Sequence, residues 1–140
     1  MYTVGMENCI FCQIVSGEIG ATKVYEDAET LAFLDIAPNN HGHTLVIPKD
    51  HFENIYSLPG ETAARMMLCA QKISIAIKNA LSCDGITITI NNEAAGGQEV
   101  FHSHIHVIPR TKDDFSIRFP HKTYLPGEAE DVANKIREEI

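Results

Sequence analysis

Short runs of apolar residues, many of them alternating with polar ones, recur along the chain and predict a series of brief strands. Alternation with period two and β-branched content are typical of strands. Five strands are predicted, at residues 22–26, 30–35, 43–48, 86–91 and 100–110. The polar tripeptide Asp27-Ala28-Glu29 separates the first two, so we expect them to form a hairpin.

Three helices are predicted from helical spacing and from capping residues. The first covers residues 8–16, with Asn8 as its N-cap and Gly17 as its stop. The second covers residues 60–82 and has a broad apolar face with a period near 3.6 residues. The third is a charged C-terminal helix at residues 127–140. The pattern predicts an α+β fold, a five-stranded antiparallel sheet with helices on one face.

Composition and charge narrow the possible functions. The 140 residues fit one domain, and no apolar run approaches the ~20 residues of a membrane span. The first residues lack a signal-peptide pattern, and we interpret the chain as cytoplasmic. The formal net charge of -8 argues against a nucleic-acid groove. It is compatible with a small phosphorylated ligand, because helix ends, backbone N–H groups and histidines can hold one phosphate locally.

The most informative segment places three histidines at alternate positions of an apolar run. On a strand, His102, His104 and His106 would share one face. A neutral imidazole can act as a nucleophile, a general base, a phosphate donor or a metal ligand. The small residues of 94–97 and the amides of Asn91 and Gln98 indicate a phosphate pocket facing this row. A metal site and a row of surface histidines are the alternatives.

The run from His102 to Val107 resembles the His-Φ-His-Φ-His-Φ-Φ signature of the histidine triad (HIT) superfamily, where Φ is apolar and Ser103 is a mild departure. The resemblance extends to Phe33-Leu34-Asp35-Ile36-Ala37-Pro38 and to residues 41–51. Cys9-Ile10-Phe11-Cys12 resembles the opening helix of the Hint-like branch. We interpret residues 1–140 as a single HIT domain, with a core at about 8–110 and a variable C-terminal segment at 111–140.

The resemblance implies a nucleotide-binding hydrolase or transferase that acts on purine nucleotide conjugates of the phosphoramidate type. His104 would attack the α-phosphorus, and water would then release a nucleoside monophosphate from the nucleotidyl-histidine. His106 would hydrogen-bond phosphate oxygens, and His102 and His43 would support and orient the row. Asp35 would accept hydrogen bonds from the ribose hydroxyls; taken alone, it is a strand-end or turn residue.

The same resemblance implies a wall for the base and contacts for the phosphate. Without the resemblance, the apolar residues of the base wall would be assigned to the hydrophobic core. The base wall would be Ile10, Phe11, Ile14, Phe33 and Ile36, and the remaining nucleotide contacts would be Asn91, Gln98, Glu99, Val100, His104 and His106.

Glu99 departs from some relatives, which place Ser there. A carboxylate near a phosphate is repulsive unless it faces away or meets a cationic leaving group. This substitution leaves the handling of the leaving group, and hence the catalytic rate, open.

Cys9 and Cys12 have the spacing of half a zinc site. A redox-active pair and two reduced thiols are the alternatives. The resemblance implies a structural zinc with His51 and His102 as the other ligands, since a Cys2His2 set leaves no open position. It implies neither a catalytic metal nor a redox cofactor. Outside this set, we interpret His41 and His121 as surface or loop histidines and Cys69 as a buried apolar residue.

The sequence leaves several functions open, and the resemblance also implies an oligomeric state. The alternatives to a phosphoramidate hydrolase are a dinucleoside polyphosphate hydrolase, a nucleotide-binding regulatory or scaffold protein with little turnover, and a metal-binding triad. Hint-like relatives are homodimers, so the resemblance implies a homodimer. The long helix, with Met66, Met67 and Ile73, and a free sheet edge would supply the interface.

Overall fold

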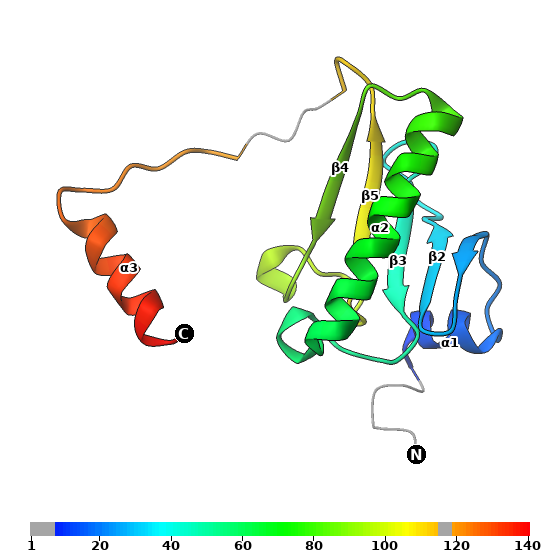
Figure 1. Ribbon diagram of the computed structural model, residues 1–140, viewed down its shortest axis with the longest axis horizontal. Helices are drawn as coiled ribbons and strands as arrows, with labels where there is room; N and C mark the ends of the chain where they lie inside the picture. Colours follow the sequence, from blue (N-terminus) through cyan, green and yellow to red (C-terminus); the bar gives the residue numbers. More distant parts are fainter. Residues whose placement is uncertain (1–7, 115–118) are drawn as a thin grey trace.

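The structure, a computed structural model, describes residues 8–114 and 119–140. Its centre is a five-stranded antiparallel sheet with the order β1-β2-β3-β5-β4 (Figure 1). The strands are β1 (Lys23–Glu26), β2 (Thr30–Leu34), β3 (Thr44–Pro48), β4 (Gly85–Ile90) and β5 (Ile105–Arg110). The predicted α+β fold is confirmed, and the first four strands begin and end within one residue of the predicted bounds.

The prediction for the fifth strand was too long at its start, because β5 begins at Ile105 and not at residue 100. Two long-range contacts bend the chain before it. The backbone N–H of Ser103 donates to the carbonyl of Phe52 at 2.7 Å, and the His102 ring donates through Nε2 to the carbonyl of Pro48 at 2.8 Å. His102 and His104 therefore precede the strand, and only His106 lies on it.

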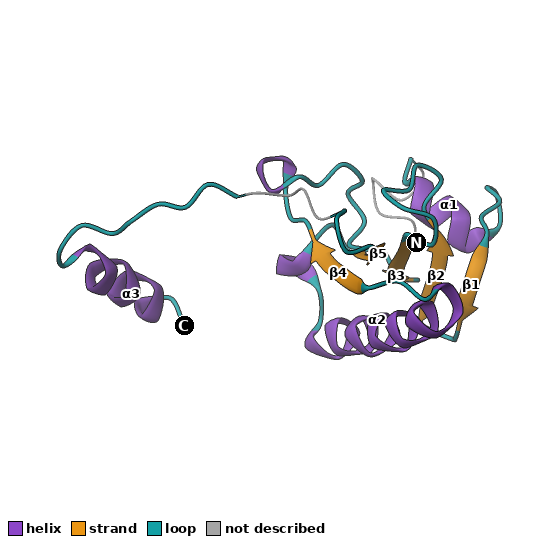
Figure 2. Ribbon diagram, turned by 90° about the horizontal axis from the view of Figure 1, so that it is seen from above, coloured by secondary structure: helices purple, strands orange, loops and turns teal. Residues whose placement is uncertain are grey.

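Helices cover both faces of the sheet, so the prediction of helices on one face was wrong. Figure 2 shows the sheet between α2 (Gly60–Leu81) and α1 (Ile10–Ser16). The reason lies in β2 and β3, whose side chains are almost all buried on either side. Strands that are covered on both faces need apolar residues at consecutive positions, which hides the alternation.

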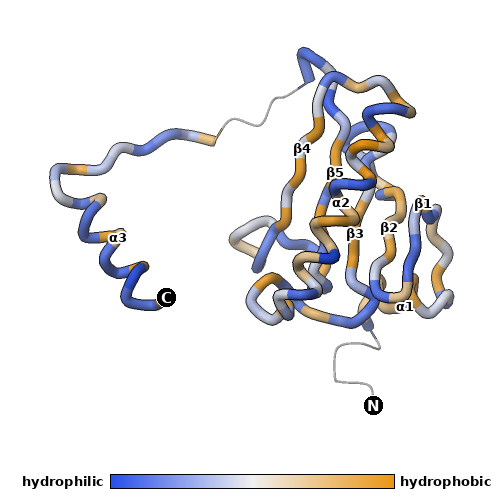
Figure 3. The backbone as a smooth tube through the Cα atoms, in the orientation of Figure 1, coloured by the Kyte–Doolittle hydropathy of each residue, from blue (hydrophilic) through white to orange (hydrophobic). Residues whose placement is uncertain are grey.

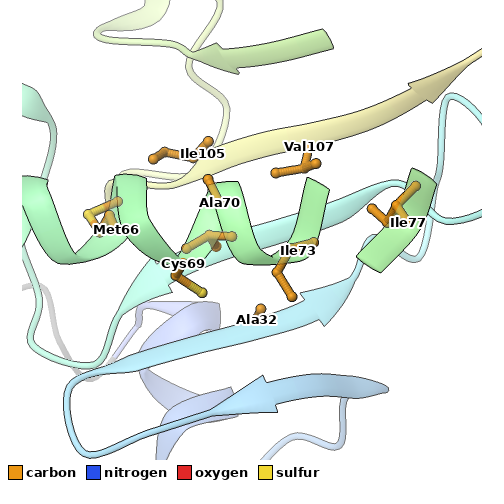
Figure 4. Close-up of a cluster of buried hydrophobic side chains, with 9 residues drawn as sticks. Ala32, Met66, Cys69, Ala70, Ile73, Ile77, Ile105 and Val107 are labelled. Atoms are coloured by element: carbon orange, nitrogen blue, oxygen red, sulfur yellow. The ribbon is translucent and has the colours of Figure 1, made fainter. Parts of the chain in front are cut away.

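The long helix α2 packs its apolar face on the sheet. Figure 4 shows Met66, Cys69, Ala70, Ile73 and Ile77 of α2 directed at Ala32, Ile105 and Val107. Met66 and Ile73 are 1% and 5% exposed, so they belong to this core and do not supply the predicted dimer interface; Met67 is 52% exposed. The burial expected for Cys69 is confirmed.

The short helix α1 is capped at its N-terminus by the first cysteine of the Cys9–Cys12 pair. Cys9, and not Asn8, is the N-cap, because its Sγ accepts from the backbone N–H of Cys12 at 3.4 Å. Gly17 ends the helix in the left-handed conformation at φ 85°, and its N–H donates to the carbonyl of Ile14 at 3.2 Å. The predicted stop at Gly17 is confirmed.

The C-terminal helix α3 (Glu128–Glu138) buries none of its residues and lies apart from the sheet in both ribbon views. Figure 3 shows it as mostly hydrophilic, in contrast to the strands. The structure also has two 3-10 turns, Ile55–Ser57 and Ala94–Gly96. Within the described ranges, no helix combines the length and apolarity needed to cross a bilayer.

Candidate functional site

A cavity of about 640 Å³ lies on the α1 face of the sheet and gathers most of the residues that were predicted for the nucleotide site. Helix α1 supplies one wall, the ends of β2 and β3 supply another, and β5 with the loop after β4 closes the third. The predicted residues that line it are Ile10, Phe11, Ile14, Phe33, Asp35, Ile36, His43, Asn91, Glu99, Val100, His104 and His106. The size suits a nucleotide.

Gln98, which was predicted to contact the ligand, is not among the residues that line the cavity. Its amide is buried and is hydrogen-bonded to backbone groups of its own loop and of the segment at Glu53. Nε2 donates to the carbonyls of Glu53 at 2.6 Å and Val100 at 3.0 Å, and Oε1 accepts from the backbone N–H of Glu93 at 2.8 Å. Gln98 therefore holds the loop before the histidines in shape, which is a structural task.

Several lining residues were not predicted from the sequence. They are Ile19, Gly20, Ala21, Leu34, Ala37, Asn39, Leu45, Thr89, Ile108 and Phe119; Gly97, from the small-residue loop predicted to border a phosphate pocket, also lines the cavity. Thr89 could in principle have been predicted, because it pairs with His106 in the β4–β5 register and so lies on the same face of the sheet. The turn at 19–21 carries no such signal, since its approach to the cavity depends on how α1 docks.

The hydrogen bond of His104 determines which of its nitrogens is free. Nδ1 lies 2.8 Å from the carbonyl oxygen of His102. A carbonyl only accepts, so Nδ1 carries the proton and Nε2 keeps its lone pair. Burial lowers the pKa of His104, against smaller opposing effects of its own hydrogen bond to His102 and the carboxylates of Asp35 and Glu99. His104 is thus a neutral imidazole with one unprotonated nitrogen, the form that can act as a nucleophile.

His43 and His106 carry their protons on the other ring nitrogen, Nε2. The backbone N–H of Asn39 donates to Nδ1 of His43 at 3.1 Å, so the proton of neutral His43 sits on Nε2. That nitrogen is 2.9 Å from Nδ1 of His106 and donates to it. His106 consequently carries its own proton on Nε2. Because burial lowers the pKa of His106 to about 4, its ring is a neutral donor at pH 7.

His104 and His106 together present a nucleophile beside a hydrogen-bond donor. Their ring centroids are 4.8 Å apart, and the rings of Phe11 and His104 pack nearly perpendicular to each other with centroids 5.1 Å apart. A phosphate that Nε2 of His104 approaches would place an oxygen near the proton of His106. This is the geometry that phosphoryl transfer needs, positioning together with charge stabilisation.

Asp35 serves the local turn and also faces the histidines. Its Oδ1 accepts from the backbone N–H of Ala37 at 2.9 Å, and its Oδ2 lies 3.6 Å from Nε2 of His43. The side chain is about one fifth exposed, which leaves the carboxylate accessible from the cavity. Ile36, by contrast, is 96% exposed and forms the rim of the cavity.

We expect His106 to make the fold sensitive to mild acid. Burial holds its pKa at about 4, below the ~6.5 of an unfolded histidine. Stability is therefore complete above about pH 6.5 and declines as the pH falls toward 4, because the unfolded chain binds the proton first. The loss from this group is at most about 1.4 kcal/mol per pH unit.

Thermal unfolding of the wild type and of His106→Asn between pH 7.5 and 4.5 measures this effect. The melting temperature of the variant should decline less steeply with falling pH. His41→Asn, at an exposed loop histidine, is the matched control and should keep the wild-type slope. Equal slopes in all three proteins would contradict the assignment.

A second cluster lies beside the cavity and brings together the four predicted zinc ligands, Cys9, Cys12, His51 and His102. The ring of His102 donates from Nε2 to Pro48, so Nδ1 keeps its lone pair and faces the sulfurs. Nδ1 of His102 is 3.4 Å from Cys9 Sγ, 3.5 Å from Cys12 Sγ and 3.2 Å from His51 Nδ1. Tetrahedral zinc with Zn–N near 2.05 Å and Zn–S near 2.3 Å implies edges of about 3.3–3.8 Å.

The donor set therefore fits zinc in both chemistry and spacing. Burial and the neighbouring Cys9 raise the pKa of the Cys12 thiol to about 12, so a metal would have to displace protons on binding. His102 links the two sites. Its imidazole belongs to this cluster, and its backbone carbonyl accepts the hydrogen bond that orients His104. A metal held here would be structural, because all four positions are protein ligands.

Within the described ranges, the other group with metal-ligand character is Asp35, His43 and His106. Its proton arrangement does not suit a cation. Nδ1 of His43 accepts from Asn39, which leaves the proton on the Nε2 that a metal would need. This argues against the alternative of a metal-binding triad.

Comparisons with known proteins give a consistent result. The model of the HIT domain matches residues 16–113. Protein hit of Bacillus subtilis is 41% identical over 138 residues, covering 96% of this chain and 95% of the relative. An adenylylsulfatase of Arabidopsis thaliana is 38% identical over 138 residues, covering 95% of this chain and 70% of the relative.

Solved structures agree with the fold. A HIT family protein from Bacillus anthracis superposes with a TM-score of 0.87 at 39% identity, covering 96% of this chain and 98% of that one. A histidine triad nucleotide-binding protein from Sulfolobus tokodaii gives 0.73 at 37%, covering 93% and 90%. A zinc-bound histidine triad family protein from Mycobacterium smegmatis gives 0.76 at 36%, covering 97% and 100%.

Proposed function

The chain belongs to the HIT domain family, and we propose that it hydrolyses purine nucleoside 5′-phosphoramidates through a covalent intermediate on His104. Family membership makes it a nucleotide-binding protein. The observation that carries the catalytic proposal is the hydrogen bond from Nδ1 of His104 to the His102 carbonyl, which leaves Nε2 unprotonated toward the cavity. The adenylylsulfatase relative supports hydrolysis at a nucleotide phosphate.

The reaction runs in two displacements. The Nε2 lone pair of His104 forms a bond to the α-phosphorus, while the P–N bond breaks and its electron pair leaves with the amine, which takes a proton from solvent. Water then attacks the same phosphorus, the P–Nε2 bond breaks, and the nucleoside monophosphate departs as one proton returns to solvent. Covalent catalysis of this kind replaces one difficult step by two easier ones.

The surrounding residues bind and orient. The Nε2–H of His106 donates to a phosphate oxygen, and His43 keeps that proton in place by donating to Nδ1 of His106. The His102 carbonyl stabilises the positive charge that His104 acquires on attack. Phe11, Ile14 and Phe33 cover the base.

We further propose that Cys9, Cys12, His51 and His102 hold a structural zinc ion, for which the zinc-bound relative is the precedent. When bound, the ion would cross-link α1 to the segment before β5, beside the cavity. We also propose that the whole of 1–140 is one HIT domain and that the protein is a homodimer.

Intact mass spectrometry after rapid quenching tests the covalent step. Wild-type protein mixed with adenosine 5′-phosphoramidate should transiently gain the mass of one adenylyl group, and peptide mapping should place it on His104. AMP release without any adduct would point to direct hydrolysis. Bound AMP with neither adduct nor turnover would favour a regulatory binding protein.

Asp35→Asn should weaken binding of AMP by roughly 10- to 100-fold, because it removes a charged acceptor for the ribose hydroxyls. The amide oxygen still accepts from Ala37, so the turn is preserved. Calorimetric titration of AMP and 2′-deoxy-AMP checks the assignment. The wild type should prefer AMP, and the preference should shrink in the variant; an unchanged preference would place the ribose elsewhere.

A further inference from the structure

The catalytic cavity has two ends, and the strand register places them at opposite ends of the stretch that carries His104 and His106. Asp35 pairs with His43, which is level with Ile108 on β5. Asn91 follows β4 and is level with His104. The interval from 104 to 108 along a strand is about 13 Å. The cavity is therefore long enough to separate a ribose at one end from a second substituent of the phosphorus at the other.

The proposed reaction assigns an occupant to each end. The ribose lies at Asp35 and the phosphate lies between His104 and His106. Attacking and leaving atoms lie in line on opposite sides of the phosphorus, and the substituents of a tetrahedral phosphorus diverge. The leaving amine thus lies on the side of the phosphorus opposite Nε2 of His104. With the ribose at Asp35, the end of the cavity that remains for the amine is the one bordered by the loop 91–100.

Glu99 is the carboxylate that reaches the catalytic cavity at that end. It also lines an adjoining cavity of about 570 Å³, and the two cavities share Ile10, Glu99 and Val100. Glu53 lines only the adjoining cavity. Among the residues that the structure describes, no lysine or arginine lines either cavity. Glu99 is exposed, so its carboxylate is available to a ligand that enters from solvent.

A carboxylate in this position is unfavourable for an anionic substrate unless something offsets it. Two like charges a few ångströms apart near a protein surface repel each other at an effective dielectric of about 20. The described lining of the two cavities holds no lysine or arginine that could offset the Glu99 charge. The leaving group of the substrate can do so.

We propose that Glu99 selects the leaving group, and that the preferred substrates are nucleoside 5′-phosphoramidates whose leaving amine carries a second, positively charged amino group. The inference rests on the proposed hydrolysis at the α-phosphate. The bonds that form and break are unchanged. The second ammonium group keeps its proton and lies beside Glu99, whereas anionic leaving groups are repelled from this end.

Three adenosine 5′-phosphoramidates test the proposal, with 2-aminoethylamine, propylamine and 2-carboxyethylamine as leaving groups. The wild type should show the highest kcat/KM for the aminoethyl probe and the lowest for the carboxyethyl probe. We expect the aminoethyl-to-propyl ratio to fall by roughly 5- to 10-fold in Glu99→Gln. Comparing this ratio between proteins cancels the intrinsic reactivity of the probes.

Glu93→Gln is the matched control, because Glu93 is an exposed carboxylate on the same loop and lines neither cavity. It should keep the wild-type ratio. Raising NaCl from 0.05 to 0.5 M should reduce the ratio in the wild type and leave it unchanged in Glu99→Gln.

The outcomes separate the two proposals. Turnover of all three probes with the same ratio in the wild type and Glu99→Gln would overturn the role of Glu99 and leave the hydrolysis standing. An equal loss of ratio in Glu93→Gln would also overturn it, since a distant charge would then act as well. Failure to hydrolyse any probe would refute the proposed function itself.

Discussion

Replacing His104 with alanine will lower turnover of adenosine 5′-phosphoramidate by at least about 10³-fold and leave AMP bound. The loss is large because, among the described residues that line the cavity, the other two histidines use their unprotonated nitrogens as hydrogen-bond acceptors. Removing a covalent nucleophile typically costs several orders of magnitude in kcat. AMP affinity should change by less than about 5-fold, since Asp35, His106 and the apolar wall remain.

Steady-state kinetics and calorimetric titration of the same preparation check both halves of this result. His121→Ala, at an exposed histidine outside the site, should match the wild type in both measurements. Substantial turnover by His104→Ala would show that water attacks the phosphorus directly. A parallel collapse of AMP binding would show that His104 supports the ligand and would leave its role as nucleophile unsupported.

Replacing Cys12 with serine will abolish stoichiometric zinc binding and lower the melting temperature by about 10 °C. Zinc that binds the folded chain alone stabilises it by mass action, and a loss of about 3 kcal/mol corresponds to this shift in a chain of this size. The effect reaches the fold because Cys12 lies on α1, whereas His51 and His102 come from segments beyond β3 and before β5.

Zinc content by elemental analysis and thermal unfolding, each with and without a chelator, test this result. Chelation should lower the melting temperature of the wild type and leave Cys12→Ser unchanged. Cys83→Ser is the control, because Cys83 is a partly buried cysteine outside the cluster. A wild type that binds no zinc, or a variant as stable as the wild type, would contradict the assignment.

Periodicity was sufficient to predict the strands and helices because each has a local signature. It was insufficient for the layering, since both faces of β2 and β3 are apolar and the sequence does not show which helix covers which face. The start of β5 depends on the contact of Ser103 with Phe52, about fifty positions away in the chain. Local alternation at 100–104 gave no sign of that contact.

The candidate site, like the fold, was predictable from the sequence only in part. The triad was visible as a pattern, and Cys9 and Cys12 were visible as a spacing. His51 joined them only through the resemblance, because nothing near Lys49-Asp50-His51 marks a ligand. The structural hydrogen bonds of Gln98 were not predictable, because one of its partners, the carbonyl of Glu53, lies in a distant segment. Polar residues in loops share one composition whether they serve a ligand or the backbone.

The proton positions on the histidines are set by main-chain groups, namely the N–H of residue 39 and the carbonyls of Pro48 and His102. Most side-chain replacements at position 39 would leave its N–H in place, and only proline would delete it. The proton positions on the histidines consequently depend on the path of the backbone. Grafting this chemistry onto another scaffold would require transplanting those loops, since the histidine side chains alone would lack the backbone groups that determine which ring nitrogen carries the proton.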